Sequence, residues 1–183
     1  MPDIFHHQNI QQFYNVAFDR DFARKNLFRL AYIDTGTDLV NFDEEDLVYV
    51  TTTSLPQRAI NNQAVPFMGL SFNVPGTASY PGSAGWNVTF RMQADLAIRR
   101  KLELWTRFIF DDLTSTGEYG IPQGIIKLSL MNSIGAPIRD YTLWGAYCVS
   151  LGDYALDTTD SGSVVTQAAT IAYQYWTAQD AIR

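Results

Sequence analysis

One stretch of the 183-residue sequence has the clear periodicity of an amphipathic helix, and it lies among short runs typical of β-strands. Apolar residues recur on one face at intervals of four, three and four: Ile98, Leu102, Trp105 and Ile109. Asp95 precedes this stripe as the candidate N-cap. The pattern predicts a helix packed on a sheet, with Arg99 and Arg100 turned toward solvent.

Most of the remaining chain has the character of short strands. Residues 87–93 alternate strictly, with Val88, Phe90 and Met92 on one face and polar side chains on the other, which indicates a half-buried strand. Further β-branched and aromatic runs occupy 26–33, 47–53, 125–131, 141–151 and 164–177. Many strands without alternating helices predict a mainly β fold, an antiparallel β-sandwich or partial barrel with one flanking α-helix.

Residues 54–85 combine turn-forming residues with apolar ones. Four prolines and four glycines disfavour both a helix and a central strand, so we expect a long irregular loop. The same stretch carries apolar side chains that must be buried somewhere: Ile60, Val65, Phe67, Met68, Leu70 and Phe72. We expect these residues to contact a neighbouring subunit. The alternative is an arm folded back over its own sandwich.

Charge and composition argue against several classes of function. Only 17% of the residues are charged and the net charge is −6, so the chain lacks the basic surface that tight nucleic-acid binding requires. The densest basic stretch, at 99–101, has Glu103 beside it and is expected to be a solvated helix face. No apolar run approaches about 18 residues and no leader peptide is recognisable, so we expect a soluble protein without a membrane anchor, made in the cytoplasm.

The sequence also predicts no catalytic, cofactor or metal site. The only histidines are the adjacent pair His6 and His7, which lack the spacing of a zinc site. The acidic clusters at 43–46 and at Asp153, Asp157 and Asp160 lack the pattern of a calcium loop and are interpreted as solvated loops. Cys148 is the single cysteine, so no intramolecular disulfide is possible, and its apolar surroundings predict burial.

Several motifs occur in an order that resembles the tail tube proteins of contractile-tailed, T-even-like bacteriophages. Residues 21–28, Asp-Phe-Ala-Arg-Lys-Asn-Leu-Phe, are similar to the family's entry to its first strand, with Lys25 where the family often has proline. Residues 86–90 lead into a helix ending in Leu-Trp, and residues 139–152 and 171–176 are similar to the family's aromatic C-terminal strands. The likeness covers about residues 20–177.

The resemblance implies one tail-tube domain over residues 1–183, with an N-terminal arm at 1–20 and an inter-subunit loop at 54–85. Its inner sheet would be completed into a barrel across subunits, six to a ring, and the rings would stack into a hollow tube. The implied partners are further copies of the chain, a tail sheath protein, a baseplate tube-initiator, and a tape measure protein and passing DNA in the lumen. The implied place is the virion, assembled in the bacterial host cytoplasm.

Two alternatives remain open at this point. The same fold serves the tubes of type VI secretion and of contractile injection particles, and a fold does not choose among machines. A carbohydrate-binding β-sandwich would account for the aromatic residues and acidic loops. Ring assembly would favour the structural role, and an exposed aromatic platform that binds glycans would favour the second alternative.

Overall fold

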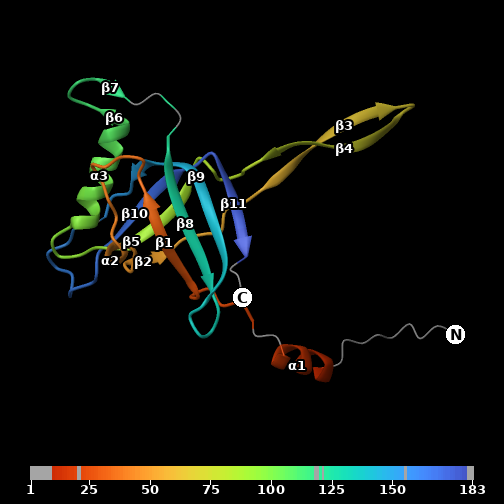
Figure 1. The fold of residues 1–183 in the computed structure, drawn as a ribbon, viewed down its shortest axis with the longest axis horizontal. Coiled ribbons are helices and arrows are strands. Elements are labelled where there is room, and N and C mark those ends of the chain that lie inside the picture. Colours follow the sequence, from red (N-terminus) through yellow and green to blue (C-terminus); the bar gives the residue numbers. More distant parts are fainter. Residues whose placement is uncertain (1–9, 20–21, 118–119, 121, 155, 181–183) are drawn as a thin grey trace.

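The computed structural model describes residues 10–19, 22–117, 120, 122–154 and 156–180, and Figure 1 shows their arrangement. His6, His7 and Asp21 lie outside the described residues. The helices are α1 (Ile10–Asp19), α2 (Glu44–Leu47) and α3 (Ala97–Ile109). The strands are β1 (Phe28–Asp34), β2 (Val50–Thr52), β3 (Ala59–Phe67), β4 (Leu70–Ser79), β5 (Trp86–Arg91), β6 (Phe110–Asp111), β7 (Thr116–Gly117), β8 (Gly124–Met131), β9 (Pro137–Leu151), β10 (Thr166–Ala172) and β11 (Tyr175–Asp180).

One curled antiparallel sheet forms the body of the protein. Its strand order is β1-β8-β9-β10-β5-β2, and β11 pairs with β9 on the edge of β9 opposite β8. The long strand β9 joins the two halves, because its residues 137–146 pair with β8 whereas Tyr147 and Cys148 already pair with β10. A strand that passes from one half of the sheet to the other lets the sheet curl around a core. The mainly β antiparallel fold with a flanking helix is therefore confirmed.

The helix α3 closes one side of this core, as the apolar stripe predicts. Ile98, Leu102 and Trp105 are fully buried, and the helix packs against β9. The Trp105 ring meets the edge of Phe42 at a centroid distance of 6.2 Å. Its indole N–H has no hydrogen-bond partner among the described residues. Ile109, at the end of the stripe, is only half-buried.

Two predictions about the surroundings of α3 are wrong. Leu96, with a φ of 54°, occupies the N-cap position, and Asp95 lies one residue earlier, where its carboxylate accepts a hydrogen bond from the Ala97 N–H at 3.2 Å. Arg100 is exposed as expected, but Arg99 is half-buried. Arg99 turns inward because the fully buried Gln167 needs polar partners: Arg99 Nη1 donates to Gln167 Oε1 at 2.5 Å.

Residues 59–79 form a regular two-stranded hairpin, so the expected irregular loop is wrong for this part of 54–85. β3 and β4 pair only with each other and extend from the body, opposite α3 in Figure 1. Each strand therefore has one unpaired edge, where a proline without an N–H is tolerated. The turn is formed by Met68 (φ 48°) and Gly69 (φ 84°), and positive φ at both central residues is what a type I′ hairpin turn requires.

Smaller departures from the expected strands also have local causes. The run 164–177 forms two strands, β10 and β11, which pair with different parts of β9. The run 47–53 contributes only β2, because residues 44–47 wind into α2. Asp43 and Asp46 form a capping box at this helical turn, with the Asp43 N–H donating to Asp46 Oδ2 at 3.0 Å.

Candidate assembly surface

The β3–β4 hairpin has one apolar and one polar face. Residues paired directly across an antiparallel ladder point to the same side, and the register pairs Val65 with Phe72 and Phe67 with Leu70. Val74 continues this side, opposite Gln63. The other side carries small or polar residues: Ala64, Pro66, Ser71 and Asn73. We call the side formed by Val65, Phe67, Leu70, Phe72 and Val74 the apolar face.

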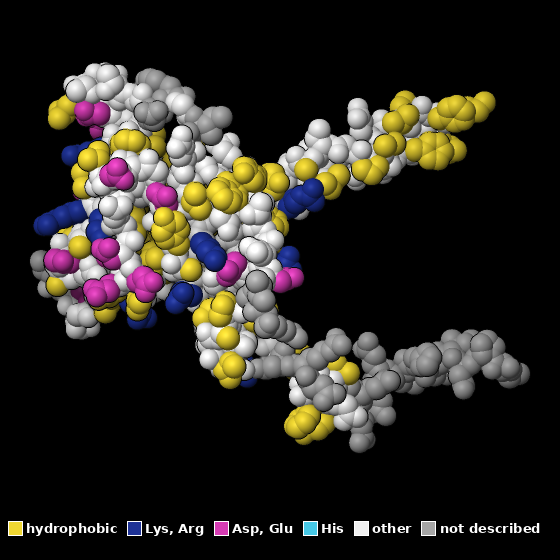
Figure 2. Space-filling view, in the orientation of Figure 1, with side chains coloured by type: hydrophobic (Ala, Val, Ile, Leu, Met, Phe, Trp, Pro, Cys, Tyr) yellow, Lys and Arg dark blue, Asp and Glu magenta, His cyan; other side chains and the backbone are white. Residues whose placement is uncertain are grey.

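The described part of the chain leaves the apolar face uncovered. Its members are 45–64% exposed, and Met68 at the turn is 88% exposed. Figure 2 shows hydrophobic side chains on much of the projecting arm. The strands and turn, residues 59–79, contain no charged residue to keep the arm solvated. A contiguous exposed apolar surface of this kind is typical of an interaction site.

The six residues predicted to contact another subunit are all exposed, but they lie at three different places on the hairpin. Val65, Phe67, Leu70 and Phe72 lie together on the apolar face. Met68 occupies the turn, and Ile60 lies near the root, beyond a bulge between Ile60 and Asn62. Whether they contact another subunit stays a prediction.

Val74 belongs to the apolar face and was missed by sequence reasoning. Its signal was the alternation of Leu70, Phe72 and Val74, which was hidden because Pro75 and Gly76 follow directly. Gly76 is required by the bulge, since a Cβ there would lie 2.8 Å from the Asn61 carbonyl oxygen.

Aromatic side chains fix the root of the hairpin to the body. Trp86 Nε1 donates to the Ser54 carbonyl at 2.7 Å, and Trp176 Nε1 donates to the Gln57 carbonyl at 2.9 Å. The rings of Tyr80 and Trp176 pack edge to face, with centroids 6.4 Å apart. These contacts hold the root of the hairpin against the body, and the tip projects away from it.

An apolar groove opens near the start of β1. Its lining comes from the segment before β1, from β1 and β8, and from the residues after β2: Ala23, Arg24, Lys25, Leu27, Phe28, Thr53, Ser54, Leu55, Leu128 and Leu130. Leu27, Phe28 and Leu130 are half-buried, and Leu55 is 45% exposed. We call this feature the β1–β8 groove.

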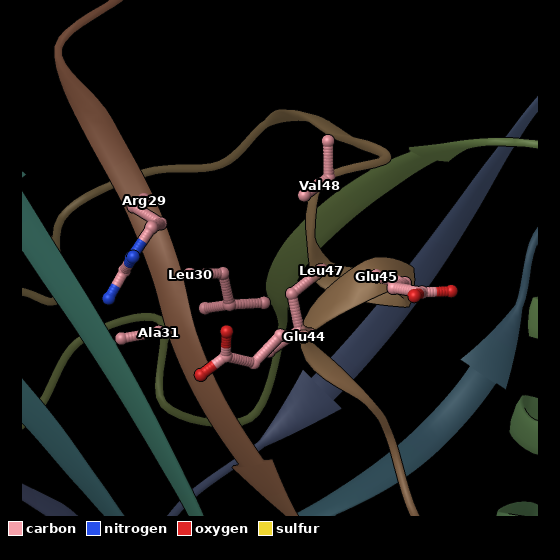
Figure 3. A pocket seen from close by; sticks show the side chains of 7 residues that line it. All are labelled: Arg29, Leu30, Ala31, Glu44, Glu45, Leu47 and Val48. Atoms are coloured by element: carbon pink, nitrogen blue, oxygen red, sulfur yellow. The ribbon is translucent and has the colours of Figure 1, made fainter.

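A second pocket lies between β1 and α2 (Figure 3). Leu30 of β1 points toward Leu47 there, whereas Ala31 extends to the other side of β1 and the Glu45 carboxylate points away from the pocket. Arg29 and Glu44 also line it, but the described residues show no ion pair between the two. Its acidic residues do not converge, and within the described ranges no cluster of three or more His, Cys, Asp or Glu residues could hold a metal ion.

The acidic clusters have structural partners. Lys101 Nζ lies 3.1 Å from Asp43 Oδ2 and 2.6 Å from Asp46 Oδ2, so a lysine of α3 balances the 43–46 cluster. Burial alone would lower the pKa of Lys101, but these two carboxylates raise it above its usual value. Hydrogen bonds from backbone N–H groups of their own loop lower the pKa of Asp157 and of Asp160.

Cys148 is buried, as predicted. Burial raises the pKa of its thiol to about 12, so the thiol stays protonated and unreactive near neutral pH.

No helix in the described part of the chain is long and apolar enough to cross a membrane.

The similarity of the chain to known proteins lies in its fold. No protein-family model matches the sequence, and no curated protein matches it significantly. Solved structures do match. A chain of the anti-feeding prophage baseplate is similar with a TM-score of 0.64 and 12% identity, over 88% of this chain and 97% of that one.

Two further similar structures are a chain of a cap and a chain of a sheath–tube complex. A chain of the anti-feeding prophage cap, described as a tube-terminating cap, has a TM-score of 0.60 and 17% identity over 88% of this chain and 93% of that one. A chain of the sheath–tube complex of PVC, an extracellular contractile injection system, has a TM-score of 0.57 and 15% identity over 91% and 97%. The chain therefore has the fold of components of contractile injection systems.

Proposed function

We propose that this chain is a structural subunit of the inner tube of a contractile tail, where rings of the protein stack into a hollow conduit. The observation that carries the proposal is the charge-free hairpin with its exposed apolar face, which a solitary protein would have no reason to keep in water. Completing the interaction surface with further copies removes that exposure.

The fold and the sequence motifs support the same role. The similar structures belong to contractile particles, and one of them is a sheath–tube complex. The motif order resembles phage tail tube proteins, which adds six-fold rings, a surrounding sheath protein, a tube-initiating baseplate protein, and a tape measure protein and DNA in the lumen. The free edges of the curled sheet offer the lateral contacts that would close a barrel across subunits.

A net charge of −6 suits a conduit for DNA, because an acidic wall does not hold the phosphate backbone. We expect no measurable affinity for duplex DNA at physiological salt. Sub-micromolar binding in a fluorescence anisotropy assay would contradict this part of the proposal.

A second candidate is the tube of a contractile injection particle. The similar structures favour it, since they come from the anti-feeding prophage and from PVC, an extracellular contractile injection system. Both candidates require the same assembly. Negative-stain electron microscopy of the purified protein at high concentration should show rings or hollow tubes. A strictly monomeric species at millimolar concentration, under several salt conditions, would exclude both.

A further inference from the structure

We infer that the β1–β8 groove of one copy receives the apolar face of the β3–β4 hairpin from the next copy along the tube. The inference rests on the proposed stacking function and names the surface that the hairpin recognises.

The two surfaces match in chemistry. The hairpin offers Phe67, Leu70 and Phe72 with no charged residue in its strands or turn. The groove offers Leu27, Phe28, Leu130 and Leu55, which are half-buried or exposed and so remain available to a further apolar surface. Contact between the two would remove apolar area from water at both sides, which is the main favourable term in association.

The occupant has to come from another copy because the hairpin is held away from its own groove. Trp86 and Trp176 fix the Ser54 and Gln57 carbonyls at the root, and the arm then extends outward as a continuous two-stranded ladder. Figure 1 shows the hairpin extending to the upper right, away from the lower edge of the body, where β1 begins and β8 ends and residues of both line the groove. Folding back would require the ladder to bend sharply or the root to detach.

Because hairpin and groove are different surfaces, their contact is head-to-tail. Such heterologous contacts do not form a closed two-fold dimer, and where the rotation between copies does not close into a ring they leave a free hairpin at one end and a free groove at the other, which gives an open stack. This is the geometry that a tube needs.

The area of the contact explains why it would operate only in rings. Two aromatic and three aliphatic side chains that are already about half covered add roughly 300–500 Å² on one side, judged from the 150–250 Å² that a whole aromatic side chain buries. A stable interface needs about 800 Å² per partner. One hairpin in one groove would therefore hold weakly, whereas several such contacts made at once between two rings would hold tightly.

Cysteine pairing tests the assignment directly. Leu70→Cys on the apolar face combined with Leu55→Cys in the groove should give a ladder of covalent multimers after mild oxidation of assembled protein. The matched control replaces Asn73→Cys, on the polar face, in the same Leu55→Cys background, and should give at least about tenfold less cross-linked product. Cys148 will not interfere, since its thiol is buried and its pKa is raised to about 12.

A second variant avoids reliance on cross-linking. Leu55→Glu should raise the protein concentration needed for tube formation at least about tenfold, whereas Leu104→Glu, on the exposed side of α3, should leave it unchanged.

The outcomes separate this inference from the proposed function. Suppose that the wild type forms tubes, but the variant with both Leu55→Cys and Leu70→Cys gives no ladder, or no more than the Asn73→Cys control. That result would overturn the groove assignment and leave the tube function standing. Intramolecular cross-links alone would show that the hairpin covers its own groove and would also overturn it. If deletion of residues 1–19 abolishes tubes while the pair fails to cross-link, α1 is the occupant. Absence of any wild-type assembly would refute the function itself.

Discussion

The body and the hairpin of this protein use apolar side chains in opposite ways. In the body, Phe90, Leu102 and Trp105 are fully buried among β5, β9 and α3. In the hairpin, Phe67, Leu70 and Phe72 are 53–64% exposed on a regular ladder. Both regions are folded, so exposure on the hairpin does not result from a lack of structure.

The difference shows that the two sets of apolar residues stabilise different states. The body residues stabilise the folded subunit, whereas the exposed part of the hairpin side chains would add free energy only if a second molecule covered it. Mutations in the two regions should therefore separate cleanly: body changes should lower the free energy of unfolding, and hairpin changes should lower assembly.

The largest expected effect is the loss of assembly when the arm is removed. Replacing residues 60–78 with a short Gly/Ser turn keeps Ala59 and Ser79, which pair at the root. We expect a monomer whose unfolding free energy is close to wild type, because β3 and β4 pair only with each other, and no tubes by electron microscopy. A variant that unfolds would show that the hairpin belongs to the core of its own body. Normal tubes would show that it has no part in stacking.

The body should respond in the opposite way. Trp105→Ala removes a fully buried ring from the contact between α3 and the sheet, and truncations of this kind cost about 3–5 kcal/mol. Urea unfolding monitored by far-ultraviolet circular dichroism measures the loss. Phe67→Ala is the matched control in the arm and should cost less than about 1 kcal/mol. A loss below about 1 kcal/mol for Trp105→Ala would mean that α3 is not anchored by its stripe.

How far the sequence predicted the molecule also differs between the two regions. In the body, burial imposes periodicity, so alternation at 87–93 and the stripe Ile98, Leu102, Trp105 predicted β5 and α3 correctly. Local periodicity does not show which polar side chains will meet when distant segments of the chain pack together. The inward turn of Arg99 toward Gln167 could therefore not be predicted.

In the hairpin, the turn residues misled the interpretation. Pro66 and Pro75 are incompatible with a central strand, and only the topology reveals that β3 and β4 are both edge strands where proline is tolerated. Four of the six residues that were selected for their apolar content lie together on the apolar face, and their contact with another subunit stays a prediction. The groove was not predicted at all, because it joins residues 23–28, 53–55 and 128–130, which only the folded sheet brings together.

A smaller effect is expected at the junction between body and arm. Trp176→Phe keeps the ring contacts with Tyr80 and Tyr141 but removes the N–H that donates to the Gln57 carbonyl. The loss of one such hydrogen bond should cost about 0.5–1.5 kcal/mol. Hydrogen exchange should rise at residues 56–59 and stay unchanged in β8. Equal protection in both proteins would show that the Trp176 hydrogen bond does not hold the root in place, where Trp86 still donates to the Ser54 carbonyl.

The smallest expected effect is on the stability of the protein at low pH, which should depend on charged residues of the body and not on the hairpin. Burial alone would raise the pKa of Asp140, but hydrogen bonds from Lys127 and Ser129, with the charges of Lys127 and Arg29, lower it below its usual value. A carboxylate whose pKa is lower in the folded protein stabilises it above the unfolded pKa, near 4, and loses this contribution as the pH falls toward the folded pKa.

Asp140→Asn should therefore lower the unfolding free energy at pH 7 by less than about 1 kcal/mol and change it less at pH 3, where the carboxylate of the wild type is becoming protonated. The residues removed from the arm, 60–78, contain no titratable group, so the hairpin-truncated protein should follow the same pH dependence as the wild type. Urea unfolding of all three proteins at pH 7 and pH 3 measures both expectations. A truncated protein with an altered acid profile would show that the arm is electrostatically coupled to the body, and the separation of the two regions would then be wrong.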